Sequence, residues 1–278
     1  MLSIYKNKNA SYTVKNLPLN LSTNSTTTAS ASVREPVLNK WKRISRKTFS
    51  IGEVTHNRVL SSLPESDFAR LLPHLQAVTL SSGENIFQPG DDSVYVYFPE
   101  TAVFSQLNVL EDGRTVETAM IGNEGIVGIS SILNSRQNVT PWTQTLLGGN
   151  AFRINTSYFK EEFNNGGFLQ TSLLEYLDFY IKQILQRVVC NNHHLVEERF
   201  STWLLMLDDR CGKNKLILTH EQIAHLLGVH RPSITCIAQN FRNKEIIDYI
   251  RGQVSILNRR KLEESACECY SAINWKFF

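Results

Sequence analysis

The segment THEQIAHLLGVHRPSITCIAQNF, residues 219–241, constrains the fold of this 278-residue chain more than any other stretch. Thr219 and Gln222 have the spacing of a capping box, in which side chains and backbone amides satisfy each other at the start of a helix. Gly228 is typical of a helix C-terminus, because glycine adopts left-handed backbone angles without penalty. Pro232 is typical of the first turn of a helix, where its missing N–H costs nothing. The segment therefore predicts two short helices separated by a tight turn.

Each of the two predicted helices has one apolar face. In the first, Ile223, Leu226 and Leu227 point inward, and Ala224 is small enough for a second helix to cross closely. In the second, apolar residues recur at i, i+3, i+4 and i+7. They are Ile234, Ile237, Ala238 and Phe241. This pattern predicts a helix-turn-helix, whose second helix stands out as a ridge that fits a DNA major groove; an ordinary helical hairpin is the alternative.

The residues after these helices add a wing and positive charge. EIIDYIRGQVSIL, residues 245–257, predicts two strands that turn at Arg251-Gly252, beside the groove. Residues 219–261 contain seven Lys or Arg residues and three acidic ones. A local excess of positive charge suits a phosphate backbone. A solvated protein surface carries such an excess equally often, so charge alone does not select DNA.

Residues 49–165 have the pattern of an antiparallel β-roll or jelly roll. Short β-rich runs alternate with turn signals. Asp112-Gly113, between VFSQLNVL and TVETAMI, predicts a hairpin, and Gly148-Gly149, between TQTLL and NAFRI, predicts another. Ahead of the strands, RVLSSLPESDFARLLPHL predicts one or two short helices broken at Leu63-Pro64.

A helical period begins after Gly166-Gly167, in residues 166–195. Its core positions alternate in steps of three and four and include one polar member. They are Leu174, Leu177, Ile181, Ile184, Val188 and Asn191. Such a seam is typical of a helix that pairs with a second copy, and a polar seam residue fixes the register of the pair. A helix packed on its own domain also shows an apolar stripe, usually a wider one; we favour a dimerisation helix.

The first 48 residues differ in composition from the rest. NLSTNSTTTASAS is polar and of low complexity, and no acidic residue precedes Glu35. Such a segment cannot bury enough apolar surface to offset its ordering entropy, so we expect a disordered tail; an organelle transit peptide is the alternative. The chain has no apolar run long enough to cross a membrane and no secretory signal, which predicts a cytoplasmic protein.

In their order along the chain, these elements resemble the Crp/Fnr family of bacterial transcription regulators. The matching residues are GENIFQPGD (83–91), EERFSTWLLM (197–206), LTHEQIAHLLGVHRPSIT (218–235) and RGQVSILNRRKLEESACECY (251–270). The resemblance covers about residues 55–270. It implies an α+β chain with a tail (1–48), a cyclic-nucleotide-binding-like sensor roll (49–165), a dimerisation helix (166–195) and a winged helix-turn-helix domain (196–278).

The same resemblance implies the partners. We expect a homodimer that binds double-stranded DNA at a two-fold symmetric site, with RNA polymerase as a further partner. The residues expected at the DNA are Arg231, Ser233, Thr235, Cys236, Gln239, Thr219, His220 and Arg251. Arg231 corresponds to a base-reading arginine, which can bond a guanine edge in two places, worth about 1–3 kcal/mol of discrimination. Ser233 and Thr219 correspond to phosphate-contacting hydroxyls. Pro232 and Cys236 replace the more usual acidic and basic residues, so we do not expect the best-known operator of the family.

The roll lacks the residues with which the family holds a cyclic nucleotide. Ile129 follows Gly128, where a glutamate would bind the ribose. TPWTQ replaces the context that would aim an arginine at the phosphate, which leaves Arg136 as a loop residue. We therefore expect that cyclic AMP is not bound in the usual manner. Two alternatives stay open: a roll without a ligand, and a roll that senses another small molecule.

The five cysteines are odd in number and scattered, which predicts free thiols in a reducing compartment. Cys267 and Cys269 could seat a metal, but no second cysteine pair lies at a zinc-site spacing. An iron–sulfur centre is also not expected, because no four cysteines cluster and none precedes Cys190. His193-His194 is typical of a structural pair. We therefore expect no metal site and no cofactor.

No catalytic constellation stands out, and we expect no enzyme. His220, His225 and His230 are five residues apart, so they do not share a helix face as metal ligands would. A cupin-like β-barrel enzyme would need several histidines on the strands, and His74 is the only histidine near them.

Overall fold

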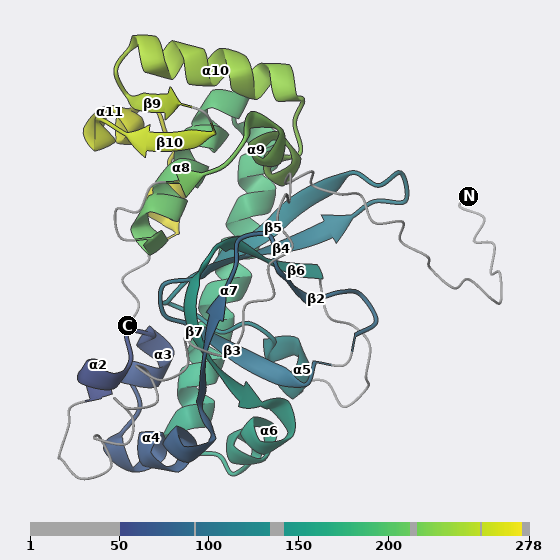
Figure 1. The fold of residues 1–278 in the computed structure, drawn as a ribbon, viewed down its shortest axis with the longest axis vertical. Coiled ribbons are helices and arrows are strands. Elements are labelled where there is room, and N and C mark those ends of the chain that lie inside the picture. Colours follow the sequence, from purple (N-terminus) through teal and green to yellow (C-terminus); the bar gives the residue numbers. More distant parts are fainter. Residues whose placement is uncertain (1–50, 92, 134–141, 212–215, 251, 274–278) are drawn as a thin grey trace, which may run out of the picture.

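The computed structural model describes residues 51–273, except for residues 92, 134–141, 212–215 and 251. The predicted tail, Arg136 and Arg251 lie outside the described residues. Strands β1 to β7 form a roll, a long helix lies beside it, and a helical domain with a small sheet stands at one end (Figure 1). Over this part of the chain, no helix combines the length and apolar character that crossing a bilayer requires.

Short helices precede the roll. They are α2 (Ile51–Val54), α3 (Arg58–Ser61), α4 (Glu65–Leu71) and the 3-10 helix η1 (Leu72–His74). Pro64 caps α4, which confirms the predicted break at Leu63-Pro64. Asn57, the cap of α3, is completely buried, and its side-chain amide donates to the carbonyl oxygens of Pro99 (3.0 Å) and Gly125 (2.9 Å). These bonds fix the short helices to the roll.

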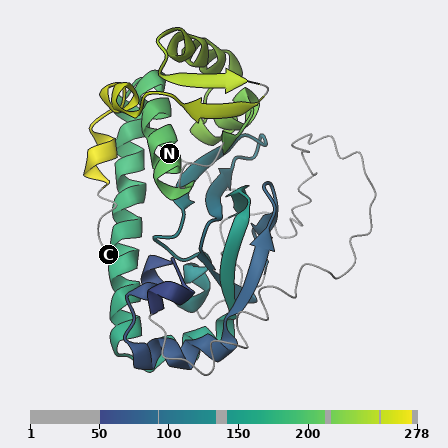
Figure 2. The ribbon, with the colours of Figure 1, turned by 60° about the vertical axis from the view of Figure 1, so that its left-hand side comes forward.

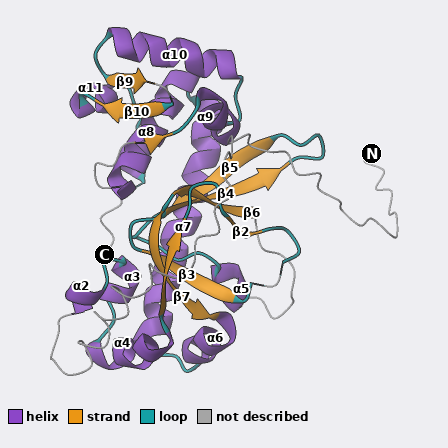
Figure 3. Cartoon of the chain, in the orientation of Figure 1, coloured by secondary structure: helices purple, strands orange, loops and turns teal. Residues whose placement is uncertain are grey.

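The roll consists of two antiparallel sheets. One has the strand order β1 (Gln76–Leu80), β7 (Gly149–Asn155), β3 (Tyr95–Pro99). The other has the order β2 (Asn85–Phe87), β6 (Trp142–Leu147), β4 (Val103–Val109), β5 (Thr115–Ile121). Figure 3 shows these strands as the middle layer of the molecule, with helices on either side. The predicted mixture of antiparallel roll and helices is confirmed.

The two predicted hairpins have different outcomes. Asp112-Gly113 does join β4 to β5, and Gly113 takes the positive φ of 83° that such a turn requires. The hairpin at Gly148-Gly149 is wrong, because β6 and β7 belong to different sheets and the chain crosses between them there. A Cβ atom on Gly149 would lie 2.6 Å from the amide nitrogen of Ala102. Close backbone approach, and not a turn, explains this glycine.

Apolar side chains fill the space between the sheets. Phe87, Tyr97, Phe104 and Ile121 are buried together there. Two further helices, α5 (Ile129–Leu133) and α6 (Thr156–Asn164), lie against the roll, and the rings of Phe98 and Phe159 meet edge to face at 5.4 Å between centroids. The interior of the roll is therefore packed with aromatic rings.

Helix α7 (Phe168–His193) runs along the molecule from the base of the roll to the helical domain (Figure 2). Leu169, Leu173, Tyr176 and Phe179 bury one of its faces against the roll. Because these residues follow helical spacing, the opposite face of α7 points away from the chain's own core.

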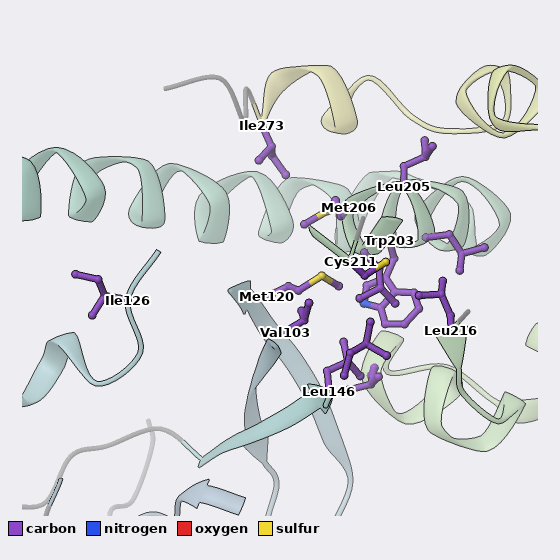
Figure 4. Packing of buried hydrophobic residues seen from close by; sticks show 14 of the residues in the cluster. Val103, Met120, Ile126, Leu146, Trp203, Leu205, Met206, Cys211, Leu216 and Ile273 are labelled. Carbon is purple, nitrogen blue, oxygen red and sulfur yellow. The ribbon is translucent and has the colours of Figure 1, made fainter. Parts of the chain in front are cut away.

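The C-terminal domain contains five helices and a three-stranded sheet within the described ranges. The helices are α8 (Val196–Cys211), α9 (His220–Leu227), α10 (Arg231–Asn243), α11 (Arg259–Glu264) and α12 (Cys269–Ala272). The strands β8 (Leu216–Ile217), β10 (Gln253–Ile256) and β9 (Ile247–Ile250) are hydrogen-bonded in that order. Figure 4 shows Trp203 and Met206 of α8 packed beside Met120 and Val103 of the roll, so one core joins the two regions.

Candidate nucleic-acid interface

The interrupted helix has the predicted local structure. The Thr219 hydroxyl accepts from the Gln222 amide at 3.2 Å, and the Gln222 side chain accepts from the Thr219 amide at 2.8 Å. Gly228 ends α9 in the left-handed conformation, with φ 64° and ψ 41°. Pro232 lies in the first turn of α10. The capping box, the glycine stop and the proline restart are all confirmed.

The core of the domain holds α10 in place from behind. Ala224, Ile234 and Phe241 are buried where α9 and α10 meet, and the ring of Phe241 stacks on Phe200 of α8 at 6.0 Å between centroids. The opposite face of α10 stands at the outer end of the molecule, away from the roll (Figures 1 and 2). A helix held this way can enter a groove without rearranging its own core.

The outer face of α10 carries most of the residues expected at DNA. Arg231, Thr235, Cys236 and Gln239 are exposed, and Ser233 is half-buried. Arg231, Thr235 and Gln239 follow one another at four-residue steps, and Ser233 and Cys236 at a three-residue step, so they form two adjacent rows on the helix. No described contact locks these side chains into the core, which leaves them available to a ligand.

Hydrogen bonds at the start of α10 orient this surface. The Thr235 hydroxyl donates to the Arg231 carbonyl at 3.2 Å and lies 3.1 Å from His220 Nδ1. The guanidinium of Arg231 lies 3.6 Å from the Glu221 carboxylate, and both side chains are exposed. An exposed pair of this kind is weak, so Arg231 can leave it for a base or phosphate.

His220 connects the recognition helix to the wing. Its ring lies against the Tyr249 ring at 4.1 Å between centroids, and the Tyr249 hydroxyl donates to the Leu218 carbonyl at 2.6 Å. Burial lowers the pKa of His220, and the positive charge of Arg231 lowers it further. The folded domain therefore favours the neutral imidazole.

The wing is confirmed as two antiparallel strands. Ser255 of β10 pairs with Asp248 of β9, and Val254 with Tyr249. The Leu218 amide donates to the Gly252 carbonyl at 2.8 Å, which ties the wing to the residue before the α9 cap. Arg251, expected at DNA, lies outside the residues that the structure describes.

The local excess of basic residues is smaller in space than in sequence. Arg259 turns toward α8, where it pairs with Asp208 and with Asp209 at 2.6 Å, and it also pairs with Glu263 at 3.0 Å. Arg260 pairs with Glu264 at 3.0 Å. The count of seven basic residues thus overstates the positive charge that this region offers to DNA.

Two buried carboxylates attach the C-terminal part of the chain to the roll, and the sequence gives no local signal for them. Glu117 of β5 accepts from Arg187 of α7 (2.9 Å), from the Trp203 indole of α8 (2.8 Å) and from Ser105 (2.6 Å). Complete burial raises the pKa of Glu117, and the Arg187 charge opposes this rise. These residues are far apart in sequence, so only the fold reveals the network.

The second carboxylate, Glu124, pairs with Arg210 of α8. Arg210 Nη2 lies 2.7 Å from Glu124 Oε1, and Arg210 Nη1 donates to the Met206 carbonyl at 2.8 Å. Burial lowers the pKa of Arg210, and the Glu124 carboxylate counters that effect. Helix α8 is thus joined to the roll by charges as well as by apolar packing.

The residues expected at the dimer seam lie on the free face of α7. Leu174, Ile181 and Val188 are 51%, 53% and 55% exposed. Leu177 and Ile184 are half-buried, and Asn191 is exposed. Leu185 and Val189 belong to the same exposed apolar stripe, although the alternating three-and-four spacing did not include them.

Metal-ligating residues gather at one place in the described part of the chain. Cys190, His194, Cys267 and Cys269 offer ligand atoms that lie within 4.8 Å of one another. We expected no metal because the sequence has no second cysteine pair. That reason does not hold, since Cys190 and His194 at the end of α7 take the place of such a pair. Their spacing of one helical turn was a signal that the sequence offered. His74, by contrast, stacks on Tyr158 at 3.7 Å between ring centroids.

Comparison with known proteins agrees with this geometry. Residues 198–265 match the sequence model of the Crp-like helix-turn-helix domain. The global nitrogen regulator of Synechococcus elongatus is 21% identical over an alignment of 196 residues, and the match covers 66% of this chain and 86% of the relative.

Solved structures of low identity share the fold. A transcriptional regulator of the Crp/Fnr family from Eubacterium rectale has a TM-score of 0.60 and 18% identity, and the match covers 75% of this chain and 97% of that one. FixK2 from Bradyrhizobium japonicum has a TM-score of 0.59 and 16% identity, and the match covers 69% and 98%. The predicted resemblance to the Crp/Fnr family is confirmed, with a Crp-like helix-turn-helix domain near the C-terminus.

Proposed function

We propose that this chain, a Crp/Fnr-type transcription regulator with a helix-turn-helix domain, binds a two-fold symmetric DNA site as a homodimer and does so without cyclic AMP. The observation that carries the proposal is the outer face of α10, which is polar and exposed and is held from behind by a packed core. The proteins it matches are described as regulators, a class that is distinct from enzymes.

At the DNA, each residue has a proposed role. Arg231 reads a guanine edge in the major groove, where its weak pair with Glu221 is exchanged for two base contacts. Thr219 and Ser233 bond phosphate groups, and Gln239 reaches a base or a phosphate. Thr235, Cys236 and His220 line the same face. Arg251, in the segment of the wing, contacts the phosphate backbone of the DNA. Phosphate contacts position the helix, and base contacts specify the sequence.

Homodimerisation is supported by the free face of α7. The seam exposes apolar side chains over much of a 26-residue helix, and a second copy of the same helix would remove them from water. Asn191 lies at the end of this face, where a polar residue can fix the register of the pair. Two copies related by a two-fold axis along α7 would present two α10 helices to one DNA duplex, as a palindromic site requires.

Independence from cyclic AMP rests on the roll. Ile129 stands where a ribose-binding carboxylate would be needed, and the interior is filled by Phe87, Tyr97 and Phe104. The second candidate is a roll that senses another small molecule. The two candidates differ in whether candidate metabolites change the affinity for DNA. We further propose a cytoplasmic location and RNA polymerase as a partner, both from the family resemblance.

Selection of bound sites from a random DNA pool tests the proposal. The purified chain should enrich a palindrome whose half-sites are about one helical turn apart, 10–10.5 base pairs. A parallel selection with Arg231→Ala should lose enrichment at a specific position within each half-site. If no duplex is enriched even at low ionic strength, DNA binding is refuted; an asymmetric single half-site would refute the dimer alone.

A further inference from the structure

Three cysteines and one histidine from two distant segments meet beside the end of α7. Cys190 lies in the last turn of that helix, and His194 follows one turn later as its C-cap, so both face the same side. Cys267 and Cys269 lie where the chain passes from α11 to α12. Cys190, Cys267 and Cys269 are all buried and form a small cluster of their own.

We propose that Cys190, His194, Cys267 and Cys269 bind one Zn²⁺ ion in a tetrahedral site. Zinc–sulfur bonds of about 2.3 Å and zinc–nitrogen bonds of about 2.0–2.1 Å place the donors of a tetrahedron roughly 3.5–3.8 Å apart. Cys190 Sγ lies 3.5 Å from Cys267 Sγ, and Cys269 Sγ lies 3.4 Å from His194 Nδ1. All four donor atoms lie within 4.8 Å of one another. The site is therefore close to the geometry that a single ion needs.

The histidine is oriented as a zinc ligand would be. Its Nε2 lies 3.2 Å from the Glu268 carboxylate, on the side away from the sulfurs. A carboxylate there accepts the Nε2–H and leaves the Nδ1 lone pair facing the cluster. Pairing of the distal ring nitrogen with a carboxylate is a frequent outer-shell arrangement of metal-bound histidines, because it fixes the tautomer and raises ligand basicity.

Polar side chains contact two of the sulfurs, as the outer-shell partners of metal-bound thiolates do. The Gln186 amide donates to Cys269 Sγ at 3.0 Å, and the Thr202 hydroxyl lies 3.1 Å from Cys267 Sγ. A buried cysteine that served only as a small apolar residue would not collect such donors.

An arginine lines the same small cavity as two of the proposed cysteine ligands. Three thiolates and one Zn²⁺ carry a net charge of about −1. Arg199 lines a small cavity together with Cys190 and Cys269. An arginine beside the thiolates would reduce the electrostatic cost of burying them.

Two other uses of these residues fit less well. In a four-iron cluster each protein sulfur binds a different iron atom, which spreads the sulfurs further apart than around one ion. A disulfide between Cys190 and Cys267 would use two of the donors and leave Cys269 and the oriented imidazole of His194 without a role. One tetrahedral ion uses all four.

The proposed ion has a structural role. Four protein ligands leave no open position for water or substrate, which is the pattern of structural zinc. The ion links the end of the long helix to the segment after the wing, and so it stabilises the junction between α7 and α8. This proposal does not depend on DNA binding, since the ligands lie away from the outer face of α10.

Metal analysis of the full-length chain, purified on a tag without histidines, tests the proposal. We expect about one zinc per chain and protection of three of the five thiols until a chelator removes the ion. Cys267→Ser should lower zinc occupancy by about tenfold or more. Cys211→Ser is the matched control, because Cys211 is equally buried but lies outside the cluster, and its zinc content should be unchanged.

Titration of the wild-type chain with Co²⁺ keeps the test decisive if a variant fails to fold. One equivalent of Co²⁺ should give thiolate charge-transfer bands and the visible bands of a tetrahedral site, and Zn²⁺ should abolish them. Failure to bind zinc or cobalt, with all five thiols free or with two lost to a disulfide, would overturn the proposal. Equal zinc loss in Cys211→Ser and Cys267→Ser would overturn the ligand assignment.

Discussion

The C-terminal domain has two faces that differ in how their polar groups are satisfied. On the outer face of α10, Arg231 and Gln239 are exposed, and the pair formed by Arg231 is long and solvated. On the inner face, Arg210 and Trp203 of α8 are buried in short bonds to Glu124 and Glu117 of the roll. Polar groups that water already satisfies can exchange partners at little cost, whereas buried ones cannot. The outer face is thus suited to binding and the inner face to holding the domain in one position.

The largest effect should come from the inner face. Glu117→Ala would leave Arg187 and the Trp203 indole without their acceptor in a buried site, a change that costs about 3–5 kcal/mol when one partner of a buried pair is removed. Urea unfolding should show a correspondingly lower midpoint. Glu111→Ala, at an exposed acid near the β4–β5 turn, should change the unfolding free energy by less than about 0.5 kcal/mol. If both variants lose the same unfolding free energy, the buried Glu117 network does not stabilise the domain more than an exposed carboxylate does.

A change on the outer face should affect selectivity and leave stability alone. Arg231→Ala should reduce discrimination between the selected site and random DNA by about 5- to 150-fold, following the 1–3 kcal/mol of a doubly bonded guanine contact. Competition gel shifts measure this, with Arg242→Ala as the control on the same helix. If the selectivity of Arg231→Ala is undiminished, Arg231 does not read a base. If its unfolding free energy falls markedly, Arg231 also contributes to the stability of the fold.

The smallest effect should come from His220, which contacts Thr235 of the outer face and Tyr249 of the wing. Burial and Arg231 depress its pKa, so the folded state binds a proton less readily than the unfolded state, whose histidine titrates near 6.5. Stability from the neutral ring is complete above that value and is lost as the pH falls through the depressed pKa. The unfolding free energy of the wild-type chain should therefore fall more than that of His220→Gln between pH 7 and 5. Parallel curves for the two proteins would contradict this.

How well the sequence predicted each region follows from the distance between partners along the chain. The capping box of Thr219, the stop at Gly228 and the buried face of α10 depend on neighbours within a few residues, and all were predicted. The predicted hairpin at Gly148-Gly149 was wrong. In the sequence, a glycine pair that forms a turn cannot be distinguished from one that allows close approach of another backbone segment.

Contacts between distant segments were invisible in the sequence for the same reason. Glu117 and Arg187 are 70 residues apart, and Cys190 and Cys267 are 77 apart. Nothing in the composition around either residue selects its partner, and the fold alone brings them together. Arg259 likewise adds a positive charge to the sequence of this region, but in the structure it pairs with a carboxylate of α8.

The glycine between α9 and α10 also touches the roll, since a Cβ atom at Gly228 would lie 3.3 Å from Val116 Cγ2 of β5. Val116 pairs with Asn108 across the β4–β5 hairpin. The turn that separates the two short helices therefore packs directly on the β4–β5 hairpin, without the long helix between them. A side chain larger than hydrogen at position 228 would press against Val116, so the glycine also sets how closely the DNA-binding helices approach the roll.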